Sequence, residues 1–165
     1  MITLSLCMII KDEELVLDRC LKSIYDAVDE IIIVDTVSTD NSKNICKNYT
    51  ENIYDYIWND DFSAARNFSF EKATKDYILW LDADEIIDEE NKEKLLNLKQ
   101  VLSLDIDVVT MHTCMNIDEC NNPQITMVRN RIVKREDNFK WIGFVHEYIE
   151  ASGNVYDSDI CIIHD

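Results

Sequence analysis

The sequence predicts an α/β fold with a mostly parallel sheet flanked by helices. Continuous apolar runs at residues 3–10, 31–34 and 77–81 read as strands buried on both faces, which is typical of parallel sheets. Amphipathic helical patterns separate these runs, as the crossover connections of a parallel sheet require. Beyond residue 105 strand-like runs follow one another without helices between them, so we expect mixed or antiparallel pairing in the C-terminal part.

The first hundred residues alternate strands with helices. After the strand at 3–10, we expect Asp12 to cap a helix, because aspartate accepts hydrogen bonds from first-turn amides. The strand at 31–34 leads into a second helix, and a third strand near 53–58 precedes a helix from 62 to about 75. The first helix carries an apolar stripe at helical spacing that should face the core: Leu17, Cys20, Leu21, Ile24 and Val28.

The C-terminal part begins with a helix that we expect Asp88 to cap. This helix carries the apolar residues Leu95, Leu96 and Leu98. Turn residues then separate strand-like runs. The expected turns lie at 121–123 and 152–154, and the expected strands at 106–112, 124–134, 139–149 and 155–165.

Length and charge limit the possible functions. A chain of 165 residues fits a single domain, residues 1–165. The net charge of −17, from 33 acidic and 16 basic residues, argues against nucleic acid as a partner, because phosphate backbones require basic patches. The start lacks the basic region of a signal peptide, and no apolar run approaches the roughly 20 residues of a membrane span. We therefore expect a cytoplasmic protein without a transmembrane segment.

The six cysteines are scattered, with no C-x-x-C pair. Cys7, Cys20 and Cys46 fall inside apolar patterns. In a chain without an export signal we expect the cysteines to be reduced, and to act as small core residues rather than zinc ligands.

Acidic residues follow the predicted parallel strands. Asp12, Asp35, Asp60 and the pair Asp82 and Asp84 come at or just after strand ends. Ligands of open α/β sheets bind at the carboxyl ends of the strands, so these acids are candidates for a site. Asp82 and Asp84 share one face of an extended chain, where two like charges repel unless a cation lies between them. The alternative for each acid is a solvated turn or a helix cap.

Five segments together resemble family-two glycosyltransferases of the GT-A fold, which are inverting enzymes. The segments are 5–14, 29–40, 61–68, 80–85 and 141–147, which reads Trp-Ile-Gly-Phe-Val-His-Glu. The last is similar to a signature of the branch that includes bacterial peptide- and protein-modifying enzymes. The resemblance implies a hexose-transferring enzyme with a nucleotide-diphosphate sugar, UDP-linked, as donor and a peptide, protein or glycan as acceptor. Residues 1–100 would form the nucleotide-binding half and 101–165 the acceptor-side half.

The resemblance also assigns donor-binding roles. Asp35 would bind the nucleotide base, with Arg66 nearby, and the backbone of Met8 and Ile9 would contact the nucleoside. Asp82 would hydrogen-bond the ribose. Asp84 of the Asp-x-Asp motif, joined by His164, would hold Mg²⁺ or Mn²⁺ against the diphosphate, which would supply the positive charge that this acidic chain lacks.

The same resemblance places the catalytic groups near residue 147. Glu147 would act as the general base that takes the acceptor's proton, and His146 would orient the acceptor. The alternative is that Glu147 only orients a neighbour while Glu85 acts as the base. Trp141 could stack on the sugar or belong to the core.

The chain departs from the family pattern in three places, one of which is Asp12, where relatives more usually carry asparagine. Val37 stands where relatives carry glycine, and a β-branched residue disfavours positive φ, so this loop is either rearranged or strained. The chain also stops at Asp165, where relatives continue, which leaves open an excised or truncated acceptor half. The remaining alternatives are a nucleotide-sugar-binding domain without turnover and a nucleotidyltransferase, although residues 11–13 lack the Gly-rich basic loop that the latter needs.

Overall fold

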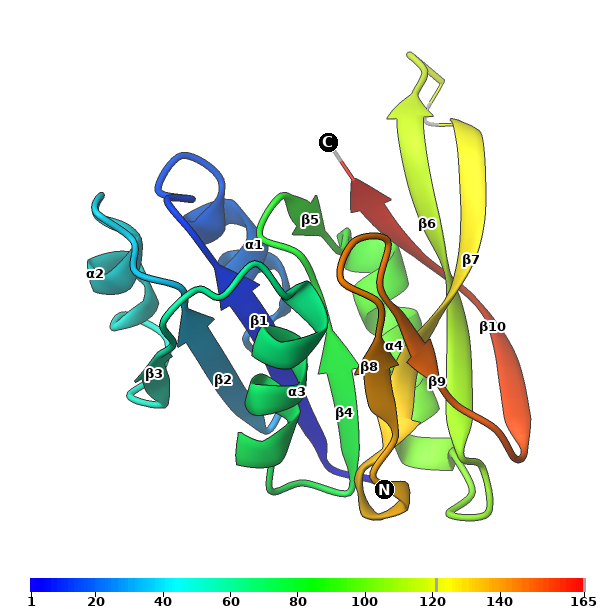
Figure 1. Ribbon diagram of the computed structural model, residues 1–165. Helices are drawn as coiled ribbons and strands as arrows, with labels where there is room; N and C mark the ends of the chain where they lie inside the picture. Colours follow the sequence, from blue (N-terminus) through cyan, green and yellow to red (C-terminus); the bar gives the residue numbers. More distant parts are fainter. Residues whose placement is uncertain (121, 165) are drawn as a thin grey trace.

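A computed structural model describes residues 1–120 and 122–164, and it confirms the α/β prediction (Figure 1). The first half contains β1 (Leu4–Ile10), α1 (Leu17–Ile24), β2 (Glu30–Asp35), α2 (Ser42–Cys46), β3 (Ile53–Asp55), α3 (Phe62–Lys72), β4 (Tyr77–Trp80), β5 (Glu85–Ile86) and α4 (Glu89–Val101). The second half contains β6 (Val108–Ile117), β7 (Pro123–Lys134), the 3₁₀ turn η1 (Arg135–Asp137), β8 (Lys140–Ile142), β9 (Tyr148–Glu150) and β10 (Val155–His164).

The main sheet has the strand order β3-β2-β1-β4-β7-β6-β10-β5, and β8 pairs separately with β9. β1 lies between β2 and β4 and runs parallel to both, as the apolar runs predicted. β7 is antiparallel to β4 and β6, while β10 is parallel to β6. The C-terminal part therefore pairs in the mixed manner expected.

Both faces of the sheet are covered, which is why its central strands are apolar throughout. α1 and α4 pack on one face through a cluster that includes Leu17, Leu21 and Leu95. α3 and the β8–β9 pair cover the other face, where Phe70 and Trp141 meet the sheet (Figure 1). All four residues of β4 are buried as a result.

The helices that follow β3 and β5 begin as expected. Asp61 caps α3 by accepting from the Ala64 amide, and Asp88 caps α4 by accepting from the Asn91 amide. In α4, Leu95 and Leu98 are buried, but Leu96 is exposed. The second helix is short, at five residues, and β3 ends at Asp55 rather than near 58.

The expected cap at Asp12 is wrong. α1 begins only at Leu17, and its N-cap residue Val16 makes no side-chain capping bond. The Asp12 carboxylate instead accepts from the Thr39 amide at 2.6 Å, so a tertiary contact takes the place of the cap. The apolar stripe of the helix is nevertheless buried as predicted at Leu17, Cys20, Leu21 and Ile24.

The single strand expected at 139–149 is also wrong. Residues 143–147 form a loop between β8 and β9, in which Gly143 and His146 have φ values of 105° and 59°. These left-handed conformations cannot continue a strand. Of the turn expected at 121–123, residue 121 lies outside the described residues, and Pro123 already belongs to β7. The final residue 165 of the last expected strand also lies outside them.

The cysteine expectation holds only in part. Cys7, Cys20 and Cys46 are free and buried, as predicted. Cys114 and Cys161 are joined in a disulfide instead of being reduced, because they lie on the adjacent strands β6 and β10 with Cα atoms 6.1 Å apart. None of the helices in the described ranges is long and apolar enough to cross a membrane.

Candidate active site

A cavity of about 620 Å³ opens at the carboxyl ends of β1, β2 and β4. We call it the donor cavity. It receives side chains from well-separated parts of the chain, because parallel strands end at one edge of the sheet. Five of the nine predicted site residues line it: Ile9, Arg66, Asp82, Asp84 and His164.

Asp35 and Met8 lie behind the cavity wall. Each has only 1% of its surface exposed, and neither lines the cavity. The Asp35 carboxylate accepts from the Ser38 amide at 3.1 Å, and Thr36 and Val37 stand between it and the open space. Asp35 can therefore contact a ligand only when the loop at 36–38 moves and exposes the carboxylate.

Asp82 and Asp84 have different partners in the structure. Oδ1 of Asp82 lies 2.8 Å from a terminal nitrogen of Arg66. Oδ1 of Asp84 lies 3.5 Å from Nδ1 of His164. The two carboxylates are therefore not an equivalent repelling pair, and only the second has a metal-ligand type of neighbour.

The Arg66 guanidinium connects Asp82 with Glu147. Its Nε donates to Oε1 of Glu147 at 2.8 Å, and its centre lies 5.1 Å and 4.7 Å from the rings of Trp80 and Trp141. Burial opposes the charge of Arg66, but Asp82 and Glu147 outweigh that effect and raise its pKa. Arg66 therefore lies beside Asp82 and Glu147, rather than beside Asp35 as the resemblance implied.

Glu85 makes a structural ion pair. It is 2% exposed, and its two carboxylate oxygens accept from the two terminal nitrogens of Arg131, Oε2 at 2.7 Å and Oε1 at 2.5 Å. Oε2 also accepts from the Asp82 amide at 2.9 Å. A carboxylate engaged in this way cannot take a proton from a substrate in the cavity, so Glu147 is the better candidate for the base.

Trp141 belongs to the core. It is 4% exposed, and its ring packs edge-on against Trp80 and Phe70 at centroid distances of 4.8 Å and 5.9 Å. Of the two roles open for it, the core role is the one that the structure supports. His146 lies in the exposed loop 143–147 and does not line the donor cavity.

Two loops at the rim of the cavity hold each other in place. Residues 11–14 after β1 and 36–42 after β2 exchange hydrogen bonds between side chains and amides, and we call them the paired loops. Glu13 and Glu14 amides donate to Ser42 and Asp40, while the Thr39 amide donates to Asp12. This last bond is the main cause that lowers the pKa of Asp12. The wall is thus preformed.

Sequence reasoning missed several residues that line the cavity. Lys11, Glu13, Trp58 and Phe62 all face it. Burial, together with the carboxylates of Asp84 and Asp40, raises the pKa of Glu13. Each of these residues lies just after a strand or at the start of a helix, and this position was the available signal.

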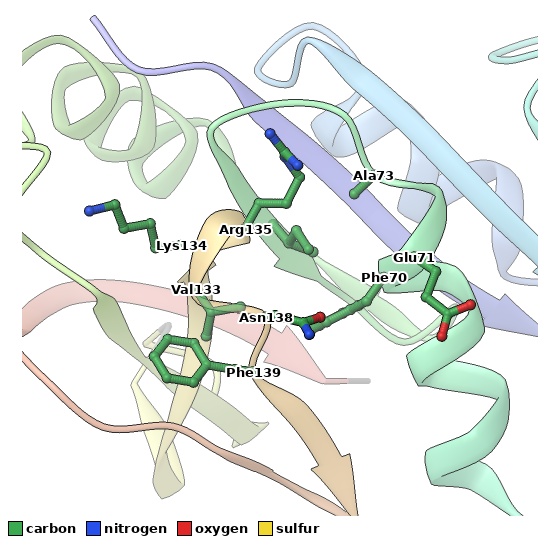
Figure 2. A pocket seen from close by; sticks show the side chains of 9 residues that line it. Phe70, Glu71, Ala73, Val133, Lys134, Arg135, Asn138 and Phe139 are labelled. Atoms are coloured by element: carbon green, nitrogen blue, oxygen red, sulfur yellow. The ribbon is translucent and has the colours of Figure 1, made fainter.

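Another hollow, of about 250 Å³, lies at the opposite end of β4 (Figure 2). Phe70, Ala73 and Phe139 contribute apolar surface, and Arg135 stands at its edge. None of the predicted site residues lines this hollow.

A family model for glycosyl transferase family 2 matches residues 5–159. The chain belongs to this family. Among solved structures, glucosyl-3-phosphoglycerate synthase from Mycobacterium tuberculosis, in complex with Mn²⁺ and UDP-glucose, superposes with a TM-score of 0.68 over 99% of this chain and 71% of that one. The sequence identity is 13%, and the likeness shows that the family-two chain has the GT-A fold that the resemblance implied.

Two curated relatives share more of the family-two sequence. The SPbeta prophage-derived glycosyltransferase SunS of Bacillus subtilis is 33% identical over 148 residues, or 88% of this chain. A TPR repeat-containing protein of Synechococcus elongatus is 49% identical over 85 residues, or 52% of this chain. The matches cover only 34% and 21% of these relatives, so the chain spans about a third of their length or less.

Proposed function

We propose that this chain is the catalytic domain of a metal-dependent inverting glycosyltransferase that uses a nucleotide-diphosphate sugar, UDP-linked, as its donor. The observation that carries the proposal is the donor cavity, where Asp82, Asp84, His164 and Arg66 converge at the carboxyl edge of a GT-A sheet. Residues 1–100 form the nucleotide-binding half and 101–165 the acceptor-side half.

The donor would lie along the paired loops. The backbone of Ile9 and the carboxylate of Asp82 would bind the nucleoside, with Asp82 on the ribose. Asp35 would reach the base after the loop at 36–38 moves and exposes its carboxylate. Met8 is buried next to Ile9 in β1 and would support that strand end. Support for a UDP-linked donor comes from the fold relative that was solved with UDP-glucose.

The residues present fit a divalent cation. A carboxylate oxygen of Asp84 and an imidazole nitrogen of His164 lie close enough to reach one ion, and diphosphate oxygens and water would complete the oxygen-rich shell that Mg²⁺ or Mn²⁺ prefers. Over residues 1–120 and 122–164, no cluster of three side chains is arranged to hold a metal without such help. When bound, the cation would neutralise negative charge on the leaving diphosphate.

Glu147 would accept the proton of the acceptor as it attacks from the face opposite the diphosphate, and His146 would orient the acceptor. The Nε–H of Arg66 holds one oxygen of Glu147 at 2.8 Å and leaves the other oxygen for the acceptor. The resemblance of residues 141–147 to the signature of the branch that includes peptide- and protein-modifying enzymes supports this assignment. The acceptor would be a peptide, protein or glycan.

The donor half of the proposal is tested by calorimetry. UDP should bind the wild-type chain in the presence of Mn²⁺ and at least tenfold more weakly in its absence or with Asp84→Ala. An exposed acid away from the cavity, changed in Glu51→Ala, serves as the matched control. Equal UDP binding with and without metal would refute the metal-dependent donor site.

Turnover is tested separately, because a domain could bind the donor without transferring the sugar. Release of UDP from UDP-sugars by the wild-type chain, measured with Glu147→Gln as comparison, distinguishes the two. An enzyme should lose at least a hundredfold in the rate of release in Glu147→Gln, while UDP affinity stays unchanged. UDP binding without any sugar release would show a binding domain instead.

A further inference from the structure

A third pocket, of about 200 Å³, lies beside Glu147, the residue to which Arg66 donates a hydrogen bond. Trp80, Trp141 and Glu147 contribute to it from the protein interior. Val128 and Tyr148 contribute from β7 and β9. Arg66 lines the donor cavity and hydrogen-bonds Glu147, which lines this pocket, so the two spaces adjoin at the Arg66–Glu147 contact. We call this space the base pocket.

One edge of β7 beside the base pocket has no strand partner among the described residues. β7 pairs with β6 along most of its length, but with β4 only through residues 132–134. Residues 123–129 are all exposed. Figure 1 shows β6 and β7 extending together beyond the end of β4. An open strand edge of this length can accept another extended chain.

The register shows which backbone groups face that open edge. The Thr110 carbonyl accepts from Ser158 of β10, so the backbone of Thr110 faces away from β7. Its partner is Asn130, whose carbonyl accepts from the Trp80 indole and so faces away from β6. Along an antiparallel pair of strands, residues whose backbone groups face the partner strand alternate with residues whose backbone groups face away from it. Val128, opposite His112, and Thr126, opposite Cys114, therefore turn their N–H and C=O groups to the open side.

Apolar side chains accompany this edge. Val128 is 59% exposed and Tyr148 is 54% exposed, and both line the base pocket. The loop that carries Glu147 also exposes Phe144 and Val145. Apolar surface beside free backbone donors and acceptors is the combination that recognises a polypeptide in extended form.

We propose that the open edge of β7 at residues 126–130 binds an extended polypeptide acceptor as an added strand. This proposal rests on the proposed function and names its acceptor class. Backbone groups that recur every second residue, about 7 Å apart, match another strand but not a glycan. One hydroxyl or thiol side chain of the bound segment enters the base pocket beside Glu147.

The transfer is balanced in this arrangement. The acceptor oxygen or sulfur forms a bond to the anomeric carbon, and the bond from that carbon to the diphosphate oxygen breaks. The nucleoside diphosphate leaves with the electron pair, and the proton of the acceptor passes to the Glu147 carboxylate. No oxidant, reductant or further reactant is needed.

The test uses a mixture of synthetic 11-residue peptides, each with one central Ser, Thr or Cys, and a mixture of soluble oligosaccharides. UDP-glucose, UDP-galactose and their N-acetylated counterparts serve as donors, and products are measured by mass spectrometry. Thr126→Pro removes an N–H that faces the open edge, and Thr126→Val keeps it. We expect peptides to be modified, and kcat/KM for peptides to fall at least tenfold in Thr126→Pro but less than twofold in Thr126→Val. Peptide should also protect the Val128 amide from hydrogen exchange.

Several results would overturn the proposal. Modification of oligosaccharides but not of peptides would overturn it, and so would donor hydrolysis without any peptide product. Equal peptide activity of the two Thr126 variants would also overturn it. So would protection of the Val128 amide that depends on protein concentration alone, because that would indicate pairing between two copies of the chain. UDP calorimetry on both variants shows whether the donor half is intact. Failure of UDP to bind would refute the proposed function itself, whereas UDP binding with transfer only to oligosaccharides would refute only the strand-edge acceptor site.

Discussion

The Nε of Arg66 lies 2.8 Å from Oε1 of Glu147, across 81 residues of sequence. The same guanidinium holds Asp82 at 2.8 Å, so one cation joins a residue of the donor cavity to the proposed base. Trp80 and Trp141 enclose it and keep water away. The bridge therefore fixes the position of Glu147 relative to the donor, and it should be sensitive to the shape of the cation.

Replacing Arg66 with lysine should reduce transfer strongly. The N–H groups of lysine all lie on one nitrogen, which cannot occupy the positions of both Nε and the terminal nitrogen of Arg66. We expect kcat/KM to fall 10- to 100-fold, about 1.4–2.7 kcal/mol. Arg66→Met should also destabilise the fold by about 3 kcal/mol, because two carboxylates lose their cation. Lys72→Met, on the same helix, is the control for both measurements. Unchanged turnover in Arg66→Lys would show that the bridge does not position the base.

Changing Glu85 should affect stability rather than chemistry. Glu85→Gln leaves the buried Arg131 guanidinium without a charged partner, which should lower the free energy of unfolding by about 3 kcal/mol in urea denaturation. Glu147→Gln should lower it by only about 1 kcal/mol, because the buried Arg66 guanidinium keeps Asp82 as a charged partner. A stable Glu85→Gln protein that had lost all turnover would instead identify Glu85 as the base.

Val37→Gly should stabilise the protein. Val37 has a φ of 68°, a conformation that costs a residue with a side chain about 1–2 kcal/mol. Glycine removes this strain, but it loses more backbone entropy on folding than valine does, which offsets part of the gain. We expect a net gain of about 0.5–1 kcal/mol in thermal unfolding. Val155 is a suitable control, since it is 51% exposed against 52% for Val37 but lies in β10 with a normal strand conformation, so Val155→Gly should destabilise. A loss of stability in both variants would argue against strain at Val37.

Glu30 should make stability depend on pH. Burial raises the pKa of Glu30, but hydrogen bonds from Ser5 and from the amide and hydroxyl of Thr74 outweigh it, so the pKa lies below the ordinary 4.5. A carboxylate with a lowered folded-state pKa stabilises fully above its unfolded pKa and loses this effect as the pH falls. Glu30→Gln should therefore destabilise by about 1–2 kcal/mol at pH 7 and by less at pH 3. The exposed Glu51→Gln should show no such difference.

Local patterns predicted the parallel half of the fold well. Strands such as β2 and β4 are buried on both faces, and their continuous apolar sequences predict this burial. The errors came from long-range contacts. The sequence around Asp12 is typical of a helix cap, but its carboxylate accepts a hydrogen bond from the amide of Thr39, 27 residues away. Gly143 and His146 break a strand-like run through backbone conformations that the side chains do not reveal.

The site was predictable to the extent that it follows strand ends. Asp82 and Asp84 were placed correctly at the cavity, but their different partners depend on Arg66 and His164, which come from distant segments. The resemblance put Arg66 near the nucleotide base and Asp35, but it did not indicate the ion pairs with Asp82 and Glu147, because sequence spacing does not show which way a helix presents its side chains. The disulfide between Cys114 and Cys161 likewise depends on the pairing of β6 with β10.

The paired loops have a consequence for how such a protein can diverge. Asp12 and Ser42 supply the accepting oxygens, so neither can change to an apolar residue without loss of a bond, whereas Thr39 and Glu13 donate through backbone amides that any residue except proline supplies. The Ser63 hydroxyl and the Arg66 guanidinium of α3 hold the loop 143–147 through the Gly143 carbonyl and the Glu147 carboxylate. Phe144 and Val145 of the same loop are exposed. Phe144 and Val145 can therefore be exchanged singly. Under the proposed function, the surface beside Glu147 can therefore diverge while the loops that would hold the nucleotide stay unchanged.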